Sequence, residues 1–292
     1  MLDCIIIGSG VAGISAALTL QSMEKRFEIF GSAILSDKVV KAERIHNYPG
    51  LSNVTGEEFQ KALIAQLKEA EITIKEEKVA GVYALKGKYA VLTQSNNTYE
   101  SRSVILACGV ESVKAIDGET DFVGRGVSYC ATCDGFLYKD KTIAIVCTTK
   151  QLEHEIEYLA DIAKKVYLIP MYKDVAVDKE NVEKIMKLPK KIQGGKRVET
   201  LLFSDPNEKD GVKTLPIDGV FMLRDSLFPS VLVGGLETQN GHVVVARDAS
   251  TNLSGCYAAG DCTGRPYQYA KAVGEGNVAA HSVIAYLKNS AE

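Results

Sequence analysis

The chain has 292 residues, of which 46% are hydrophobic and 24% are charged, and its formal net charge is −3. This length is enough for two domains of ordinary size, and the composition is that of a globular protein. The slightly acidic balance excludes nucleic acid as the expected main ligand. No apolar run is long enough to span a membrane, and the N-terminal MLDCIII enters a strand without the regions of a signal peptide.

The chain contains seven cysteines. An odd number in a chain of this length favours a reducing compartment over a disulfide framework. We therefore expect a cytoplasmic protein whose cysteines are mostly free thiols.

The chain begins with a predicted βαβ unit: a buried strand over 4–7, a glycine turn, an apolar helix and a second strand over 27–30. The turn reads GxGxxG, with Gly8 permitting the tight turn, Gly10 the approach of a pyrophosphate, and Gly13 close packing of helix and strand. This context favours dinucleotide binding over a purely structural turn. One feature departs from the pattern, because Phe30 and Gly31 stand where an acidic residue usually contacts the ribose.

A helix entering a strand over 63–74 and strands over 82–85, 89–93 and 103–107 are predicted next. The segment SYCATCDGF then places Cys130 and Cys133 three residues apart. A zinc site would need a second arm that the chain lacks, and a structural pair of thiols remains an alternative, so a redox-active dithiol is favoured. Asp134 is a candidate for moving a proton to or from the attacking sulfur; its alternative roles are a solvated acid or a helix cap.

A second βαβ unit follows over 141–169, with strands at both ends and a helix that places four apolar residues on one face. Its turn, from Cys147 to Lys150, contains no glycine. Cys147 is either a second redox site or, preferably, a small buried hydrophobe. Near the end, GCYAAGD predicts a strand and NVAAHSVIAYL a helix. The four histidines are scattered, and none is predicted to be catalytic.

This order predicts an α/β protein of two Rossmann-like nucleotide-binding domains, the second inserted in the first. The expected limits are 1–110 and 240–292 for the domain made of both chain ends, and 111–239 for the inserted redox domain.

The segment GRGVSYCATCDGF, together with GSGVAG, HNYPG and YAAGD, resembles the low-molecular-weight thioredoxin reductases over nearly the whole chain. The resemblance implies FAD in the domain made of both ends, the CxxC in the inserted domain, thioredoxin as substrate, no metal, and a homodimer. It also implies that Cys133 lies next to the flavin and that Cys130 attacks thioredoxin. The implied FAD-binding residues are Gly8, Ser9, Gly10, Ala12, Gly13, Asn47, Cys108, Gly109, Gly260, Asp261 and Gln268.

Several positions depart from this family. Residues 36–38 read Ser-Asp-Lys instead of Gly-Gly-Gln, and Tyr267 and Tyr269 flank Gln268, where an arginine usually precedes it. Both tyrosines are candidates for stacking on the isoalloxazine ring, with ordinary packing as the alternative.

The departures also affect the site for NADPH. The glycine turn is missing at 147–150, the basic cluster is replaced by Pro170-Met171-Tyr172, and the apolar-Gly-x-x-Pro segment is replaced over 223–229. A 2′-phosphate needs charged, bidentate partners such as arginine. The pattern resembles the ferredoxin-dependent flavin thioredoxin reductases, which work without a pyridine nucleotide.

Reduced ferredoxin is therefore the expected electron donor. An NADPH-dependent thioredoxin reductase with an atypical site, a flavin-bound redox sensor, and a flavodoxin or deazaflavin donor remain alternatives. Ferredoxins are usually acidic, so the basic segment 187–197, with Lys190, Lys191, Lys196 and Arg197, is a candidate docking site, and a solvated hairpin is its alternative.

Overall fold

The computed structural model describes residues 1–292 except 36, 41, 111–115, 205–210, 225–228 and 290–292. Its contacts divide the chain into two compact units. Unit 1 consists of Met1–Val110 and Phe228–Glu292, and unit 2 is Glu111–Leu227. No helix among the described residues is long and apolar enough to cross a membrane.

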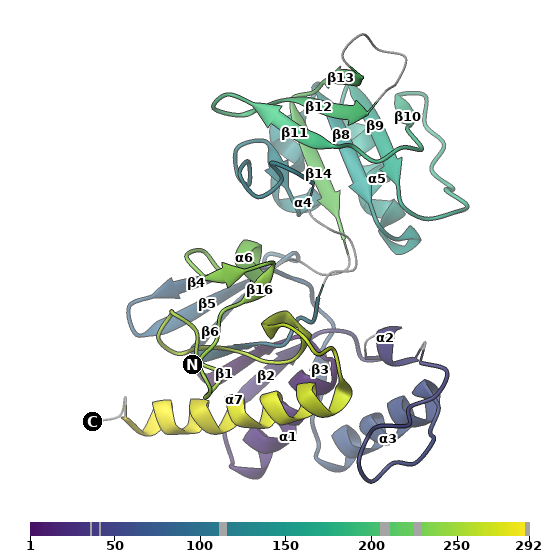
Figure 1. Cartoon of the computed structure of the whole chain (residues 1–292). Helices are drawn as coiled ribbons and strands as arrows, with labels where there is room; N and C mark the ends of the chain where they lie inside the picture. The colour runs from purple at the N-terminus through teal and green to yellow at the C-terminus, as the bar shows by residue number, and fades with distance from the viewer. Residues whose placement is uncertain (36, 41, 111–115, 205–210, 225–228, 290–292) are drawn as a thin grey trace. The chain divides into compact units, whose positions relative to one another are not determined.

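Unit 1 is built on a sheet that, among the described residues, has seven strands in the order β3-β2-β1-β6-β5-β4, with β17 also paired to β6 (Figure 1). The central strand β1 runs parallel to β2 and β6, and its isoleucines are buried because both faces of the sheet are covered. The strands are β1 (Leu2–Ile7), β2 (Phe27–Phe30), β3 (Ile74–Lys75), β4 (Val79–Leu85), β5 (Lys88–Thr93), β6 (Thr98–Leu106) and β17 (Cys256–Ala258).

The helices of unit 1 include α1 (Val11–Ser22), α2 (Asp37–Val40), α3 (Gly56–Glu69), α6 (Pro229–Leu232) and α7 (Tyr269–Asn289). A capping box between Thr55 and Glu58 starts α3. Helices α1 and α7 pack closely because Gly276 has no side chain, and a Cβ there would lie 2.1 Å from the carbonyl oxygen of Ala12. The short elements β15 (Thr238–Gln239), β16 (His242–Val243) and the 3-10 helix η3 (Asp261–Thr263) complete the unit.

Unit 2 contains a parallel sheet with the order β10-β9-β8-β14-β7 and an antiparallel sheet with the order β11-β12-β13. The parallel strands are β7 (Val127–Ser128), β8 (Thr142–Cys147), β9 (Lys165–Pro170), β10 (Val182–Lys184) and β14 (Gly219–Leu223); the antiparallel strands are β11 (Lys191–Gly194), β12 (Val198–Ser204) and β13 (Val212–Pro216). The helices are α4 (Ala131–Asp134), η1 (Gly135–Tyr138), η2 (Lys150–Leu152) and α5 (Glu153–Ile162). Ile156 and Leu159 of α5 are fully buried, as the predicted apolar face requires.

The predicted α/β class with two nucleotide-binding units is confirmed. The contacts assign Glu111–Leu227 to unit 2, whereas the sequence predicts an inserted domain over 111–239. The reason is that α6 packs against β4 and β16, and Val233 forms a bridge with Val82, so this segment belongs to unit 1.

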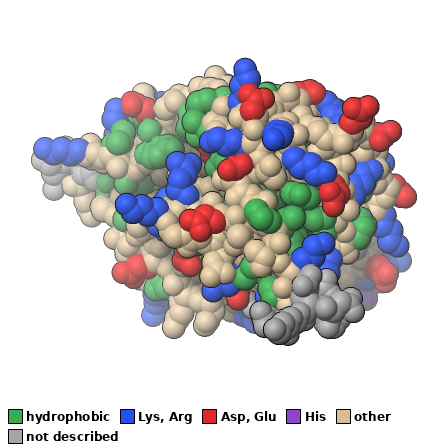
Figure 2. All heavy atoms as spheres, turned by 90° about the horizontal axis from the view of Figure 1, so that it is seen from above, with side chains coloured by type: hydrophobic (Ala, Val, Ile, Leu, Met, Phe, Trp, Pro, Cys, Tyr) green, Lys and Arg blue, Asp and Glu red, His purple; other side chains and the backbone are tan. Residues whose placement is uncertain are grey.

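Charged side chains are mixed over the surface. On the face seen in Figure 2, lysine and arginine side chains alternate with aspartate and glutamate side chains, and hydrophobic groups lie between them. The segment 187–197 forms a loop, strand β11 and the turn into β12, and Lys190, Lys191, Lys196 and Arg197 are all exposed.

Candidate functional site

The glycine turn of unit 1 has the tight geometry that its sequence predicts. Gly8 has a φ of 114°, and a Cβ there would lie 2.2 Å from the carbonyl oxygen of Ala107. A Cβ on Gly13 would lie 1.9 Å from the carbonyl oxygen of Gly8. Neither position admits another residue, because the clashing atoms belong to the backbone. The turn therefore brings the start of α1 directly against the ends of β1 and β6.

The start of α1 is open. Gly10 is the N-cap residue, no side chain caps the helix, and its first turn contains no acidic residue. A Cβ on Gly10 would meet no atom within 4 Å. Ser9 donates from its hydroxyl to the carbonyl oxygen of Ser32 at 2.9 Å, and Ala12 lies against Gly260 and Gly276. Uncapped N–H groups beside open space fit the pyrophosphate of a dinucleotide.

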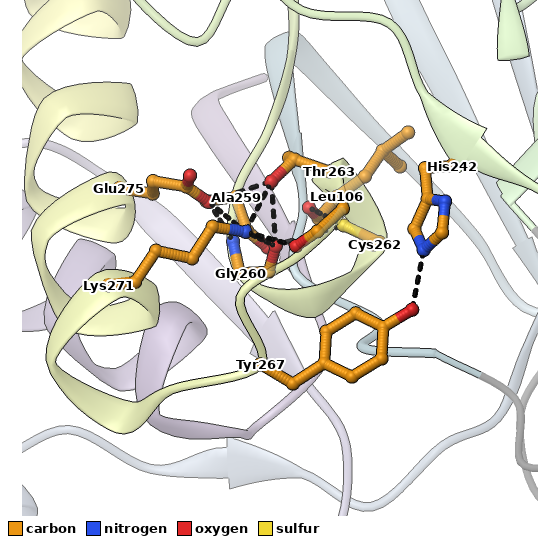
Figure 3. A network of polar contacts seen from close by, with 10 residues as sticks. Leu106, His242, Ala259, Gly260, Cys262, Thr263, Tyr267, Lys271 and Glu275 are labelled. Atoms are coloured by element: carbon orange, nitrogen blue, oxygen red, sulfur yellow. Dashed lines mark hydrogen bonds and ion pairs between the residues drawn. The ribbon is translucent and has the colours of Figure 1, made fainter. Parts of the chain in front are cut away.

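A polar network holds the loop after β17, which contains Gly260 and the half-buried Asp261 (Figure 3). Glu275 accepts hydrogen bonds from the Gly260 N–H at 2.9 Å and the Thr263 hydroxyl at 2.8 Å. Lys271 donates to the Gly260 carbonyl oxygen at 2.8 Å and forms an ion pair with Glu275 at 3.2 Å. Lys271 and Glu275 were not predicted from the sequence, because their importance lies in contacts with Gly260 that only the fold creates.

Cys108 and Gly109 follow β6, next to this loop. Gly109 has a φ of 67°, and a Cβ there would meet no atom within 4 Å. Cys108 is half-buried, and the neighbouring thiol of the fully buried Cys262 lowers the pKa of Cys108. The ends of β6 and β17 thus lie beside the start of α1, since Gly8 approaches Ala107 and Gly260 approaches Ala12.

Asn47 and Gln268 lie 221 positions apart in the sequence but are in contact. The Asn47 amide donates to the Gln268 side-chain oxygen at 2.5 Å. The structure therefore joins two of the residues that the resemblance assigned to the flavin.

The two tyrosines beside Gln268 have different surroundings. Tyr267 is exposed and its hydroxyl hydrogen-bonds His242 at 2.6 Å, as Figure 3 shows. Tyr269 instead packs edge-on against Phe59, with 5.5 Å between the ring centroids, and burial raises the pKa of its hydroxyl. Packing against the unit 1 core therefore accounts for Tyr269, and Tyr267 remains the candidate for stacking on a flavin ring.

In unit 2, Cys130 and Cys133 form a disulfide, with 5.3 Å between their Cα atoms. Cys130 is the N-cap of α4, and its sulfur accepts a hydrogen bond from the Cys133 N–H at 3.2 Å. Cys130 is 7% exposed, whereas Cys133 is half-buried. A donor aimed at the Cys130 sulfur would stabilise its thiolate after reduction.

Asp134 is linked to this disulfide through Ser128. The Ser128 hydroxyl donates to the Asp134 carboxylate at 2.7 Å and accepts from the Cys130 N–H at 3.1 Å. Ser128 lies on β7, six residues before Asp134, and no sequence pattern predicted its role. These contacts place the carboxyl group beside the redox pair.

The turn between β8 and α5 is filled by its own side chains. The buried Cys147 thiol donates to the Thr149 carbonyl oxygen at 3.2 Å, and the Thr149 hydroxyl accepts from the Gln151 N–H at 3.5 Å. The Thr148 N–H donates to the carbonyl oxygen of Leu223 at 3.0 Å. A 3-10 turn, η2, then replaces the open glycine loop found before α1.

Acidic residues occupy the first turn of α5. Glu153 and Glu155 both lie there, and the Glu153 carboxylate accepts from the Tyr172 hydroxyl at 3.1 Å and the Ala176 N–H at 2.9 Å. Burial raises the pKa of Tyr172, so the hydroxyl stays a neutral donor. Carboxylates at a helix start repel a phosphate, so this helix lacks the electrostatics of a nucleotide site.

Arg224, from the segment that replaces the apolar-Gly-x-x-Pro pattern, is fully buried. It forms an ion pair with Glu119 at 2.8 Å, and Glu119 also accepts from the Tyr129 hydroxyl at 2.7 Å and the Ile116 N–H at 2.8 Å. Of the other predicted departures, residues 225–228, residue 36 and the side chains of residues 37 and 38 lie outside the described residues.

Comparison with known proteins adds to this geometry. A family model described as pyridine nucleotide-disulphide oxidoreductase matches residues 2–276. A thioredoxin reductase from Listeria monocytogenes is 30% identical over 99% of this chain and 95% of its own length.

Two solved structures are also similar to this chain. A crystal structure of a ferredoxin-flavin thioredoxin reductase from Clostridium acetobutylicum has 44% sequence identity and a TM-score of 0.85, and covers 99% of this chain and 98% of its own. The structure of a thioredoxin reductase from Gloeobacter violaceus has 25% identity and a TM-score of 0.76, and covers 99% and 94% of the two chains.

Proposed function

The chain belongs to the pyridine nucleotide-disulphide oxidoreductase family and is a FAD-binding flavoprotein, and from this premise we propose that it reduces thioredoxin with electrons from reduced ferredoxin instead of NADPH. The predicted FAD residues of unit 1 and the Cys130–Cys133 disulfide of unit 2 are the parts of this reaction that the chain supplies. Its assembly as a homodimer and its cytoplasmic location remain predictions.

One observation carries the choice of donor: the two βαβ units differ at the position where a dinucleotide binds. The start of α1 is uncapped, free of acidic residues and beside open space. The start of α5 follows a turn in which the Gln151 N–H is already bonded to the Thr149 hydroxyl, and it carries Glu153 and Glu155. A pyrophosphate needs the first arrangement and is repelled by the second.

The two other contacts that NADPH would use point the same way. Pro170 and Met171 stand where a 2′-phosphate would need arginines. Arg224 lies in the third segment, but its guanidinium is buried against Glu119. The similarity to the ferredoxin-flavin thioredoxin reductase of Clostridium acetobutylicum, at 43–44% identity, supports the same donor.

When bound, FAD supplies a centre that accepts electrons one at a time and releases them in pairs. Two electrons and two protons convert the Cys130–Cys133 disulfide into a dithiol. The half-buried Cys133 is the sulfur proposed to face the flavin, and the hydrogen bond from the Cys133 N–H favours the thiolate of Cys130. Asp134, held by Ser128, is proposed to take up and return the proton.

The Cys130 thiolate then attacks one sulfur of the thioredoxin disulfide and forms a mixed disulfide. Cys133 attacks the Cys130 sulfur, which restores the internal disulfide and releases thioredoxin with two thiols. Electron transfer in this direction is favourable. The reduction potential of a ferredoxin is about −400 mV, that of a thioredoxin is about −270 mV, and the difference is about 130 mV. For two electrons this corresponds to about 6 kcal/mol.

The test compares electron donors for the purified flavoprotein with thioredoxin. We expect thioredoxin reduction with reduced ferredoxin, and none with NADPH, with NADH or without a donor. As a control, Cys133→Ser should abolish thioredoxin reduction, whereas reduced ferredoxin should still bleach its flavin. Rapid bleaching of the flavin by NADPH alone would refute the proposed donor. Bleaching by ferredoxin without thioredoxin reduction in the wild type would favour a redox sensor.

A further inference from the structure

Two cysteines outside the CxxC motif meet at the ends of neighbouring strands of unit 1. Strands β6 and β17 are parallel, with Leu106 opposite Ala258, and the Ala259 N–H donates to the Leu106 carbonyl oxygen at 2.9 Å. Cys108 lies two residues beyond Leu106, and Cys262 lies in η3, just after the turn that follows β17. The sheet register therefore brings together two thiols that are 154 positions apart in the sequence (262 − 108).

The fold positions the Cys262 sulfur firmly. It lies 3.2 Å from the Ala259 carbonyl oxygen and 3.3 Å from the Leu106 carbonyl oxygen, at the strand end that Cys108 follows. Figure 3 shows Cys262 with Leu106 and Ala259 beside the network around Gly260. Among the described residues, the free thiols also include Cys4, Cys147 and Cys256, all buried.

The two thiols are chemically unequal. The hydrogen bond from Cys262 is the main cause that lowers the pKa of Cys108, and the same bond is the main cause that raises the pKa of Cys262 well above its ordinary value. Cys108 is also the less deeply buried member of the pair. One sulfur is thus suited to act as a nucleophile, and the other remains a protonated, buried neighbour.

We propose that Cys108 and Cys262 form a second redox pair, separate from Cys130 and Cys133, which a hydroperoxide oxidises to a disulfide. The Cys108 thiolate attacks the O–O bond, takes up one oxygen as a sulfenic acid and releases hydroxide or an alkoxide. The Cys262 thiol then condenses with the sulfenic acid, forming the S–S bond and releasing water. Two electrons pass from the two sulfurs to the peroxide.

The resulting bond would join the end of β6 to the loop that Lys271 and Glu275 hold, which contains Asp261. Oxidation would therefore act on a segment whose Gly260 and Asp261 the resemblance assigns to FAD binding, at a site distinct from the disulfide that serves thioredoxin. The inference does not depend on the electron donor, because it concerns thiols of unit 1 alone.

The test uses the reduced holoprotein and hydrogen peroxide at equimolar concentration. Remaining thiols are alkylated, the protein is digested with trypsin, and the peptides are fragmented in a tandem mass spectrometer, which distinguishes Cys256 from Cys262 on the tryptic peptide that they share. We expect free Cys108 and free Cys262 to disappear together and a peptide pair linked through them to appear. Cys256 is an internal reference, because burial raises its pKa to about 12 and it should be alkylated only after unfolding.

Three variants identify the steps. In Cys262→Ser the reaction should stop at the sulfenic acid on Cys108, which dimedone traps. Cys108→Ser should leave Cys262 as a thiol, and Cys256→Ser should form the link as the wild type does. The inference is refuted if the wild type keeps both thiols while Cys130 and Cys133 oxidise, if its Cys108 sulfenic acid persists without a link, or if Cys108 pairs with Cys256.

Discussion

Two glycines of the turn before α1 have different structural roles, and substituting each by alanine should distinguish these roles. A Cβ on Gly13 would overlap the Gly8 carbonyl oxygen, whereas a Cβ on Gly10 would enter open space at an ordinary φ of −72°. We expect Gly13→Ala to destabilise the protein with or without FAD, by about 1–3 kcal/mol or more, as overpacking does. Gly10→Ala should keep the stability of the FAD-free protein within about 1 kcal/mol.

The expected effect of Gly10→Ala is on FAD alone. Its methyl group would occupy the space that the pyrophosphate needs, so FAD should dissociate at least tenfold more readily. The measurement is the FAD-to-protein absorbance ratio after dialysis, combined with thermal unfolding of the FAD-free protein. Unchanged FAD retention in Gly10→Ala would contradict the placement of the pyrophosphate at α1.

These glycines could be predicted from the sequence because local chain geometry demands them. Lys271, Glu275 and Ser128 could not, since their importance lies in contacts across the fold: Lys271 reaches back to Gly260 and Gly264, and Ser128 reaches Asp134. The proximity of Cys108 and Cys262 could not be predicted from the sequence for the same reason, because it depends on the register of β6 and β17.

At the level of elements, the buried ion pair between Glu119 and Arg224 joins the end of β14 to the segment before β7. The Tyr129 hydroxyl also binds Glu119, and Tyr129 directly precedes Cys130. Leaving a buried carboxylate without its cation destabilises a protein by more than the intact ion pair stabilises it. Arg224→Met should therefore lower the free energy of unfolding of unit 2 by about 3–5 kcal/mol.

Replacing the buried carboxylate by a neutral amide should restore most of the lost free energy of unfolding. In the double variant Glu119→Gln with Arg224→Met, the amide keeps an acceptor for Tyr129 and no buried charge remains unpaired. Urea unfolding followed by far-UV circular dichroism measures the difference, since the chain has no tryptophan. If Arg224→Met were as stable as the wild type, or the double variant less stable than the single one, the charge argument would be wrong.

The elements also show where sequence patterns stop being informative. The apolar face of α5 and the missing glycines of its turn were readable, because both depend on residue types at fixed spacing. The pairing of Glu153 with Tyr172 was not, because it depends on how the chain beyond β9 returns to the start of α5. The predicted limit near residue 239 differs from the end of unit 2 because α6 packs on β4, a long-range contact without a local signal.

For the whole molecule, the sequence predicted both units and the insertion of one in the other, because the βαβ plan occurs twice. It could not rank surfaces for a protein partner. The net charge of −3 opposes the approach of an acidic ferredoxin, so docking needs a local positive field within about one Debye length, roughly 10 Å at 0.1 M salt. The exposed lysines of segment 187–197 supply such a field in unit 2.

The corresponding prediction reverses two of these charges. Lys190→Glu with Lys191→Glu should raise the ferredoxin concentration needed for half-maximal thioredoxin reduction several-fold, because charges at the rim of an interface act mainly on the association rate. The difference should shrink as salt is added. Lys164→Glu with Lys173→Glu is the matched control, since it changes the net charge of the exposed surface equally without touching the segment. Equal effects of both pairs would assign the response to net charge alone, and no effect of either would exclude this segment as the docking site.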